Sequence, residues 1–284
     1  MAVAPTRPLA VLTGATGGIG RALADTFVRH GFDLLVSAHD DGVDALPAEL
    51  TAPPAHRIHG PSPQAAQVVP GAVVTAVRAD LTTSDGVRAL VAAVRGRGRP
   101  VDVLALNAGA AHGGAFVESS LQGDLDVVAL NVTATVHLAK ELVPAMVERG
   151  AGRVLITAST AAAMPGPWFA TYAASKSFLV SFGAALRHEL RGTGVTVTTF
   201  LPGPADTALF VRSGMGRTRV GRGTKDSAST VAATAFRGLM AGRATVVMRS
   251  IKPVLQVVAG AVLPRRLAAV AQAVYTSPRP GPTS

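Results

Sequence analysis

The chain has 284 residues, of which 48% are hydrophobic and only 15% are charged, so it can bury one large core and fits a single α/β domain. Its lack of cysteine excludes disulfides, thiolate catalysis and thiolate zinc ligands, and is compatible with a cytoplasmic location. The net charge of +10 comes with aromatics at only 4%, and the arginines are dispersed except at Arg212–Arg222, so we expect no nucleic-acid partner.

The first apolar run is a short one at Leu9–Leu12, which ends in glycines. It is too short for a signal peptide, and no stretch reaches the roughly 18 to 20 apolar residues of a membrane span. We therefore expect a cytoplasmic protein, and we expect no metal site.

A strand, a glycine turn and a helix follow one another at the start of the chain. Leu9–Leu12 is followed by Thr-Gly-Ala-Thr-Gly-Gly-Ile-Gly and then by residues at helical spacing. Glycines at 14, 18 and 20 let the backbone turn sharply and approach a pyrophosphate, whose charge suits a helix N-terminus. A plain tight turn and another nucleoside cofactor, such as S-adenosylmethionine, remain open.

The second strand, Phe32–Ala38, ends where dinucleotide-binding proteins select their coenzyme. An acid there binds the ribose 2′-hydroxyl and repels a 2′-phosphate. Ala38 occupies that position, and His39 and Asp40 follow. The sequence therefore favours NADP over NAD, with His39 as a candidate phosphate contact, although Asp40 weakens this preference.

The middle of the chain continues the alternation of helices and strands. We predict a helix at Val43–Leu50, a proline-rich insertion at Thr51–Pro70, a strand at Ala72–Ala79, a helix at Ser84–Arg95 and a strand at Val101–Leu106. Asp80 follows the third strand, where it either accepts from an adenine amino group or caps the next helix. Asn107, Ala108 and Gly109 follow the fourth strand, where small residues leave room for a ligand.

A long helix is predicted from about Leu121 to Glu148, with Asn131 in its middle. Asparagine is a poor interior helix residue, because its side chain competes for backbone hydrogen bonds. Asn131 therefore either caps a local irregularity or has a function. The next predicted strand, Gly152–Ser159, carries Ser159 at its end.

Tyr172 and Lys176 lie four residues apart in a predicted helix, Ala170–Arg191, and so share one face. A cation beside a phenol favours the phenolate and lowers the tyrosine pKa toward a useful range. The pair is thus a candidate acid–base pair, although the same spacing also occurs on an ordinary helix surface. Alternating strands and helices throughout predict a Rossmann-type doubly wound parallel sheet with helices on both faces.

The last third of the chain is less informative. We predict a strand at Val195–Leu201 ending in Pro202-Gly203, a small substrate lobe at about 205–226, a helix at Ser227–Ala241 and a strand at Thr245–Met248. Apolar residues in and before the lobe suggest an apolar substrate, although they serve equally well as packing: Trp168, Phe169, Phe210 and Met215.

The domain is predicted to span 1–250, followed by an extension at 251–284. The extension holds two apolar stretches, Val254–Leu263 and Leu267–Tyr275, and a tail from Ser277 that we expect to be disordered. For these stretches three roles are open: packing on the protein's own core, contact with a membrane surface, and covering a partner subunit.

Taken together and in this order, these motifs resemble the short-chain dehydrogenase/reductase family over roughly residues 8–248. The resemblance implies reversible hydride transfer between a nicotinamide coenzyme and a carbonyl or secondary alcohol, usually in a homo-oligomer. It implies that Tyr172 is the general acid/base, that Lys176 lowers its pKa and binds the ribose, that Ser159 positions the substrate oxygen, and that Asn131 anchors a water.

By the same resemblance, a further set of residues binds the coenzyme: Thr13, Gly14, Thr16, Gly18, Ile19, Gly20, His39, Asp80, Leu81, Asn107, Ala108, Gly109, Pro202, Gly203 and Thr207. The chain departs from the family pattern at Leu106, where a first asparagine is common, and at His39, where NADP-preferring relatives often carry arginine. Two rivals stay open: a regulator that binds NAD(P) without turnover, and a methyltransferase.

Overall fold

The computed structural model describes residues 7–52, 71–204, 218, 225–248 and 263–276. Most of the predicted insertion at Thr51–Pro70, most of the predicted substrate lobe, all but the last residue of the apolar stretch Val254–Leu263 and the tail from Ser277 lie outside these residues. The strands are β1 (Leu9–Thr13), β2 (Asp33–Ala38), β3 (Val74–Arg78), β4 (Val103–Leu106), β5 (Gly152–Thr157), β6 (Val195–Leu201) and β7 (Thr245–Val247).

The helices alternate with these strands along the chain. They are α1 (Gly18–Arg29), α2 (Gly42–Thr51), α3 (Ser84–Arg95), α4 (Leu121–Val128), a π-helical turn η2 (Ala129–Thr133), α5 (Ala134–Arg149), a 3₁₀ turn η3 (Thr160–Ala163), α6 (Ala170–Glu189), α9 (Ala228–Met240) and α11 (Arg265–Thr276).

The strands form one parallel sheet in the order β3-β2-β1-β4-β5-β6-β7. The chain moves from β1 outward to β3, then crosses to β4 on the other side of β1. Ligands of such sheets bind at this reversal, outside the carboxyl ends of the strands. The predicted doubly wound sheet is therefore confirmed, and it places the candidate site between the ends of β1 and β4.

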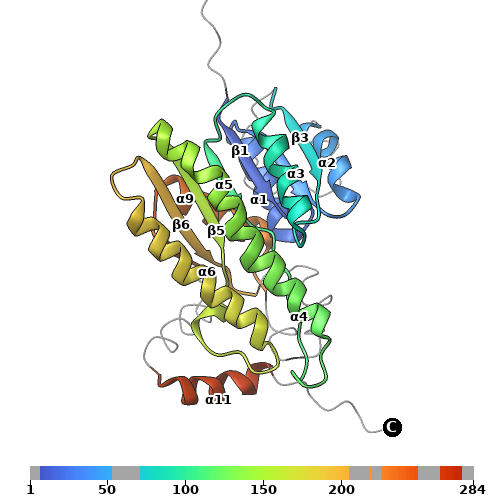
Figure 1. Cartoon of the computed structure of the whole chain (residues 1–284), viewed down its shortest axis with the longest axis vertical. Coiled ribbons are helices and arrows are strands. Elements are labelled where there is room, and N and C mark those ends of the chain that lie inside the picture. The colour runs from blue at the N-terminus through green and yellow to red at the C-terminus, as the bar shows by residue number, and fades with distance from the viewer. Residues whose placement is uncertain (1–6, 53–70, 205–217, 219–224, 249–262, 277–284) are drawn as a thin grey trace, which may run out of the picture.

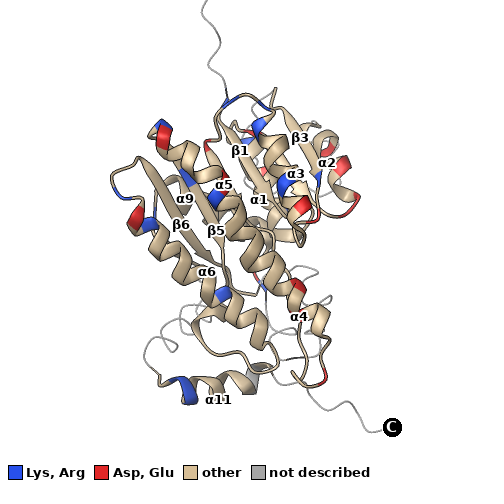
Figure 2. Ribbon diagram, viewed as in Figure 1, with Lys and Arg blue, Asp and Glu red and all other residues tan. Residues whose placement is uncertain are grey.

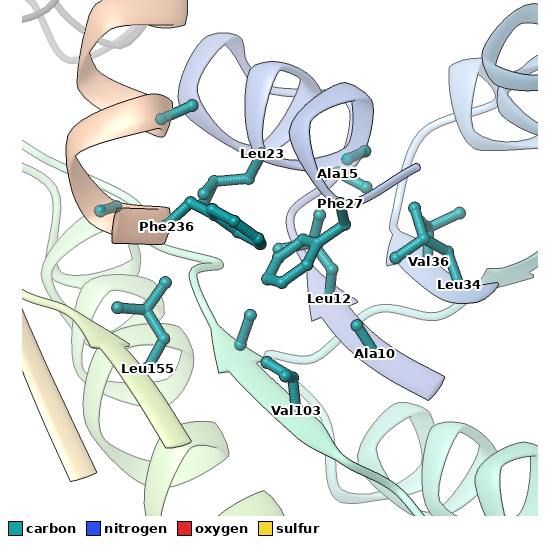
Figure 3. Close-up of a cluster of buried hydrophobic side chains, with 14 of the residues drawn as sticks. Ala10, Leu12, Ala15, Leu23, Phe27, Leu34, Val36, Val103, Leu155 and Phe236 are labelled. Atoms are coloured by element: carbon teal, nitrogen blue, oxygen red, sulfur yellow. The ribbon is translucent and has the colours of Figure 1, made fainter. Parts of the chain in front are cut away.

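Each face of the sheet carries its own hydrophobic core. Residues of α1, α2 and α9 pack on one face, and residues of α3, α5 and α6 pack on the other, nearer the viewer in Figure 1. On the first face the rings of Phe27 and Phe236 meet edge to face, with their centroids 5.4 Å apart (Figure 3). Every residue of β1 and β2 is buried, which explains why these two strands appear in the sequence as apolar runs rather than as alternating apolar and polar residues.

The predicted helix over 121–148 is not one continuous α-helix, and this prediction was wrong at its centre. It is divided into α4 and α5 by the π-helical turn η2, in which the N–H of Ala134 donates to the carbonyl of Ala129. Asn131 lies inside the turn and is completely buried. Of the two readings of Asn131, a local irregularity is therefore present; π turns are often found at functional sites.

The described part of the extension is α11, which lies beyond the carboxyl edge of the sheet (Figure 1). Ala268, Gln272 and Thr276 are buried, whereas Leu267 and Val270 are 57% and 68% exposed. No helix among the described residues is both long and apolar enough to cross a membrane. Contact of the extension with a membrane surface stays a prediction.

Candidate active site

The glycine turn after β1 packs more tightly than any residue with a side chain would allow. A Cβ on Gly20 would lie 1.9 Å from the carbonyl oxygen of Gly14. Gly14 itself has a φ of +68°, and a Cβ there would lie 2.8 Å from Cα of Ala108. The turn is thus held against both α1 and the end of β4 because these positions carry no side chain.

The amino end of α1 is open to a ligand. Gly17 precedes it without any side-chain cap, and its first turn contains no acidic residue. Its backbone N–H groups and its dipole therefore favour an anion. Thr16, beside it, donates its hydroxyl to Asp40 at 2.7 Å, which ties the glycine turn to the end of β2.

The side chain of Thr13 links the end of β1 to the end of β4 through hydrogen bonds. Its buried hydroxyl oxygen accepts from the backbone N–H groups of Asn107 and Ala108 at 3.0 and 2.9 Å. The amide of Asn107 donates in return to the carbonyl of Thr13 at 3.0 Å. These bonds lock the ends of β1 and β4 together, so Thr13 and Asn107 shape the cleft through the backbone.

Tyr172 and Lys176 lie in the first two turns of α6, and both are buried. The ammonium of Lys176 is 5.8 Å from the centroid of the Tyr172 ring and donates to the carbonyl of Thr157 at 3.1 Å. A Cβ on Gly109 would lie 3.0 Å from that ammonium. The end of β4 therefore comes directly to the tyrosine–lysine pair.

Asn131 connects the end of β4 to α6. Its Oδ1 accepts from the N–H of Ala110 at 2.8 Å, while its Nδ2 donates to the carbonyl of Ala110 and to the hydroxyl of Ser175, both at 2.9 Å. Ser175 donates in turn to the carbonyl of Tyr172 at 2.7 Å. Asn131 is thus joined to the backbone of Tyr172 through one hydroxyl.

Ser159 follows β5 and begins the turn η3. Its hydroxyl oxygen accepts from the N–H of Ala161 at 3.1 Å, and its side chain is hydrogen-bonded to Tyr172. The neighbouring Thr160 N–H donates to the carbonyl of Pro202 at 3.0 Å, which brings the end of β6 beside it. The structure therefore gathers Asn131, Ser159, Tyr172 and Lys176 around one point.

Burial is the largest influence on the pKa values of Tyr172 and Lys176. Desolvation raises the pKa of Tyr172, and the hydrogen bond with Ser159 opposes that shift. Burial also lowers the pKa of Lys176 to about 8. Desolvation is thus the largest effect on both groups, and Lys176 is not among the causes of the shift in the Tyr172 pKa.

The other end of the cleft carries the groups predicted near adenine. Oδ1 of Asp80 accepts from the N–H and the hydroxyl of Thr82, which lowers the Asp80 pKa. Thr83, not Asp80, is the N-cap of α3. The side chain of His39 is exposed. Its charge, when present, lowers the pKa of Asp80 as a smaller effect.

A small cavity lies near Tyr172. Its volume is about 20 Å³, it is partly open to solvent, and it is lined by residues from the loop after β4, the start of α4 and the loop before α6: His112, Gly113, Gly114, Phe116, Ser119, Asp124, Trp168, Phe169 and Ala170. Phe169 packs with Tyr172 in one buried cluster. Trp168 and Phe169, which the sequence offered either as contacts of an apolar substrate or as packing, line this cavity.

Sequence reasoning missed His112, Ser119, Asp124 and Ser175. Ser175, within the helix of Tyr172, looks in sequence like any small helical residue, and only its contact with Asn131 distinguishes it. Two of the other predicted residues, Pro202 and Gly203, follow β6 as expected, whereas Thr207, Phe210 and Met215 lie outside the described residues.

The chain matches the family model described as short chain dehydrogenase over residues 8–217. It is 36% identical over 239 residues to the 1-deoxy-11-beta-hydroxypentalenate dehydrogenase of Streptomyces exfoliatus, which covers 82% of this chain and 80% of the relative.

Two solved structures extend this similarity to the fold. A short-chain dehydrogenase from Sphingobium yanoikuyae in complex with NADPH has a TM-score of 0.75 at 27% identity, and covers 89% of this chain and 93% of its own. An actinorhodin polyketide ketoreductase variant with NADPH has a TM-score of 0.69 at 31% identity, covering 84% and 94%.

The sheet order, the glycine turn and these matches agree over most of the chain. The protein therefore belongs to the short-chain dehydrogenase/reductase family and is an NAD(P)-dependent oxidoreductase.

Proposed function

We propose that the protein transfers hydride reversibly between NADP(H) and an apolar ketone or secondary alcohol, with Tyr172 as its proton donor and acceptor. The supporting observation is the position of Tyr172: its buried phenol is hydrogen-bonded to Ser159 and lies beside Lys176, where β4 ends. The cavity next to it has aromatic walls, which suits an apolar substrate.

The residues at the switch point fit a dinucleotide. The close backbone approach at Gly14 and Gly20 leaves the uncapped amino end of α1 free of side chains. This end, together with Thr16, Gly18 and Ile19, would bind the pyrophosphate. Ala108 and Gly109 would leave room for the nicotinamide ribose beside Lys176. Asp80 and Leu81 would flank the adenine, and Pro202, Gly203 and Thr207 would close the nicotinamide end.

The coenzyme, when bound, supplies or accepts the hydride. Tyr172 gives its phenolic proton to the substrate oxygen during reduction and takes it back during oxidation. Ser159, already bonded to that phenol, holds the same oxygen in place. The two hydroxyls would thus bind one substrate oxygen from two elements, α6 and the loop after β5.

Lys176 and Asn131 serve the tyrosine in different ways. The Lys176 ammonium uses one hydrogen on Thr157 and keeps its others for the coenzyme ribose. Both Nδ2 hydrogens of Asn131 are occupied by Ala110 and Ser175. A relay water at Asn131 would therefore have to donate to an oxygen of that residue, either Oδ1 or the carbonyl in the π turn.

The preference for NADP is supported by the contacts of Asp40. Its Oδ2 accepts from Thr16 at 2.7 Å, and its Oδ1 accepts from the N–H of Gly42 at 3.1 Å. A carboxylate whose two oxygens already accept hydrogen bonds within the protein is a poorer partner for a ribose 2′-hydroxyl. The exposed His39 is left as the group that meets a 2′-phosphate.

The acid–base role is tested by Tyr172→Phe. We expect the variant to lose at least about a hundred-fold in kcat on a panel of ketones and alcohols, since proton transfer by a positioned side chain contributes about 10²–10⁴-fold. The affinity for NADPH, measured by fluorescence titration, should change little, because the phenyl ring is retained.

Retained turnover in Tyr172→Phe would refute the proposed role. A wild-type protein that binds NADPH but turns over no member of the panel would instead point to a regulator that senses the coenzyme.

The coenzyme preference is tested by titrating NADPH and NADH into wild-type protein and His39→Ala. We expect NADPH to bind more tightly to wild type, and the variant to lose about ten-fold or more of its NADPH affinity with no loss of NADH affinity, the value of one hydrogen bond to a charged group. His188→Ala, an exposed histidine at the far end of α6, is the control. Equal losses for both coenzymes would contradict this role of His39.

A further inference from the structure

Large apolar side chains lie on the exposed face of α11. Leu267 and Val270 are 57% and 68% exposed, and Leu263, just before the helix, is 36% exposed. Positions 263, 267 and 270 follow helical spacing, so these side chains share one face. The opposite face is the buried one, and it is mostly polar: Ala268, Gln272 and Thr276.

This arrangement is the reverse of an ordinary surface helix, which buries an apolar stripe and turns polar residues to water. Burying a glutamine and a threonine while a leucine and a valine face solvent leaves the favourable burial of apolar area unused. The exposed face of α11 therefore suits a partner that supplies an apolar environment.

The cations at the start of α11 indicate the charge of that partner. Arg265 and Arg266 are exposed, and within the described part of the chain neither forms an ion pair. By contrast, the exposed Arg88 and Arg95 of α3 pair with acids. The helix itself contains no acidic residue, and its amino end already attracts anions through the helix dipole. The surroundings of this end thus favour negative charge.

The unbalanced charge of the whole protein belongs to the same part of the sequence. Residues 1–204 contain equal numbers of acidic and basic residues, so residues 205–284 carry the entire net charge of +10. Asp226 is the last acidic residue of the chain. A polyanionic surface would therefore be attracted to this part of the chain rather than to the rest.

A second exposed apolar segment lies at the same end of the molecule. Phe116 and Val117, in the loop that leads into α4, are 70% and 91% exposed. This loop and α11 both lie at the lower end of the long axis in Figure 1, beyond the carboxyl ends of the strands. An extended surface at this end can contact both segments.

We propose that α11 docks the protein on an anionic lipid bilayer. Leu263, Leu267 and Val270 enter the boundary between headgroups and acyl chains, while Arg265 and Arg266 bind lipid phosphates. Helices with an apolar face and flanking arginines lie in the plane of the membrane interface, and one this short binds reversibly. A second copy of the chain fits this face less well, because it would bring four unpaired arginines together.

The test measures sedimentation of the full chain with vesicles of phosphatidylcholine alone or mixed with phosphatidylglycerol. We expect the affinity for the anionic vesicles to be at least about ten-fold higher, because each basic residue near an anionic surface adds to binding. Added salt should reduce the affinity for the anionic vesicles, because it screens these charges.

Two pairs of substitutions separate the apolar contacts from the charges. Leu267→Ser with Val270→Ser removes apolar anchors, and Arg265→Gln with Arg266→Gln removes two cations. Each pair should lower the affinity for anionic vesicles by about ten-fold or more. Circular dichroism and NADPH titration check that the variants fold, and because the pairs alter different side chains, each tests the proposal without the other.

Arg237→Gln with Arg243→Gln is the matched control for charge. Both arginines are exposed, and Arg243 lies just before β7, at the amino edge of the sheet and so at the opposite end of the molecule. This pair loses the same charge as the arginine pair of α11 and should keep most of the vesicle affinity.

The proposal is overturned if wild type binds neither kind of vesicle or binds both equally. It is also overturned if the α11 variants bind vesicles as wild type does. In that case, a lower molar mass of these variants in light scattering would assign the exposed face of α11 to a contact between copies of the chain.

Discussion

At the scale of single residues, Lys176 is a buried charge, and its burial destabilises the folded chain. It is 4% exposed, burial lowers its pKa to about 8, and its ammonium donates a hydrogen bond to the carbonyl of Thr157. A group with this lowered pKa binds fewer protons in the folded chain than in the unfolded chain between about pH 8 and its ordinary value of 10.5. Its cost to folding is therefore full below pH 8 and disappears as the pH rises toward 10.5.

Replacing Lys176 by methionine should therefore stabilise the ligand-free protein while removing its activity. We expect the free energy of unfolding at pH 7 to rise by about 1–3 kcal/mol, since a shift of one pKa unit corresponds to about 1.4 kcal/mol and the hydrogen bond to Thr157 is lost. The gain should shrink as the pH approaches 10.

The measurement is urea unfolding at pH 7, 8.5 and 10. Lys140→Met, at an exposed position of α5, is the control and should show no such pH dependence. A Lys176→Met variant that is less stable than wild type at every pH would contradict the cost assigned to the buried charge.

At the scale of elements, the site is built where backbones meet without side chains between them. The turn after β1 approaches α1 at Gly20 and β4 at Gly14, and the end of β4 approaches Lys176 at Gly109. The π turn η2 makes a second contribution to the site. It positions the amide of Asn131 to form hydrogen bonds with the backbone of Ala110 and with Ser175. Both arrangements fix the positions of the proposed catalytic groups by means of backbone geometry.

Gly20→Ala tests the close approach of the turn to α1. Its Cβ would meet the Gly14 carbonyl at 1.9 Å, so the turn must move. We expect a loss of about 2 kcal/mol or more of stability, as for other overpacked sites, and a weaker affinity for NADPH. Thermal unfolding and coenzyme titration measure the two effects.

Gly17→Ala is the control for stability. Its Cβ would have only the Gly14 carbonyl nearby, at 3.6 Å, so it should cost no more than about 1 kcal/mol, the usual loss for alanine at an N-cap. Equal stability losses in the two variants would show that crowding at Gly20 is not the cause.

At the scale of the whole molecule, charge is dispersed and apolar exposure is concentrated. Lysines and arginines are spread over many elements in Figure 2, and no described face in that view collects them. By contrast, Leu121, Leu125 and Val128 are exposed at helical spacing along α4, and Phe178 is exposed on α6, a helix that α4 contacts. Exposed apolar stripes of this kind are typical of subunit interfaces.

We therefore expect the protein to be a homo-oligomer that uses this apolar stripe of α4. Leu125→Glu combined with Val128→Glu should reduce the molar mass measured by light scattering to that of one chain, because charged residues are disfavoured at the centre of an interface. Met240→Glu, at an exposed position of α9, should leave the mass unchanged. A wild-type protein that is monomeric at micromolar concentration would refute the expectation.

The sequence by itself determined the fold and the chemical class. Apolar runs that alternate with helical segments predicted the parallel sheet, and the glycine turn, Ser159 and the Tyr172/Lys176 spacing indicated the family. These signals are local, because a strand, a turn or a pair on one helix face depends on residues near one another in the chain. They also placed Asn131 as an unusual residue, without revealing that the helix changes to a π turn there.

Only the tertiary structure decided which groups share an environment. The direction of the Tyr172 pKa shift, the bond from Asn131 to Ser175 and the unpaired nitrogen of His112 all arise where segments distant in the chain meet. The physical reason is that burial and hydrogen-bond partners are set by packing between elements. A sequence pattern records which side chains are present, whereas the fold decides which of them lose water and which gain a partner.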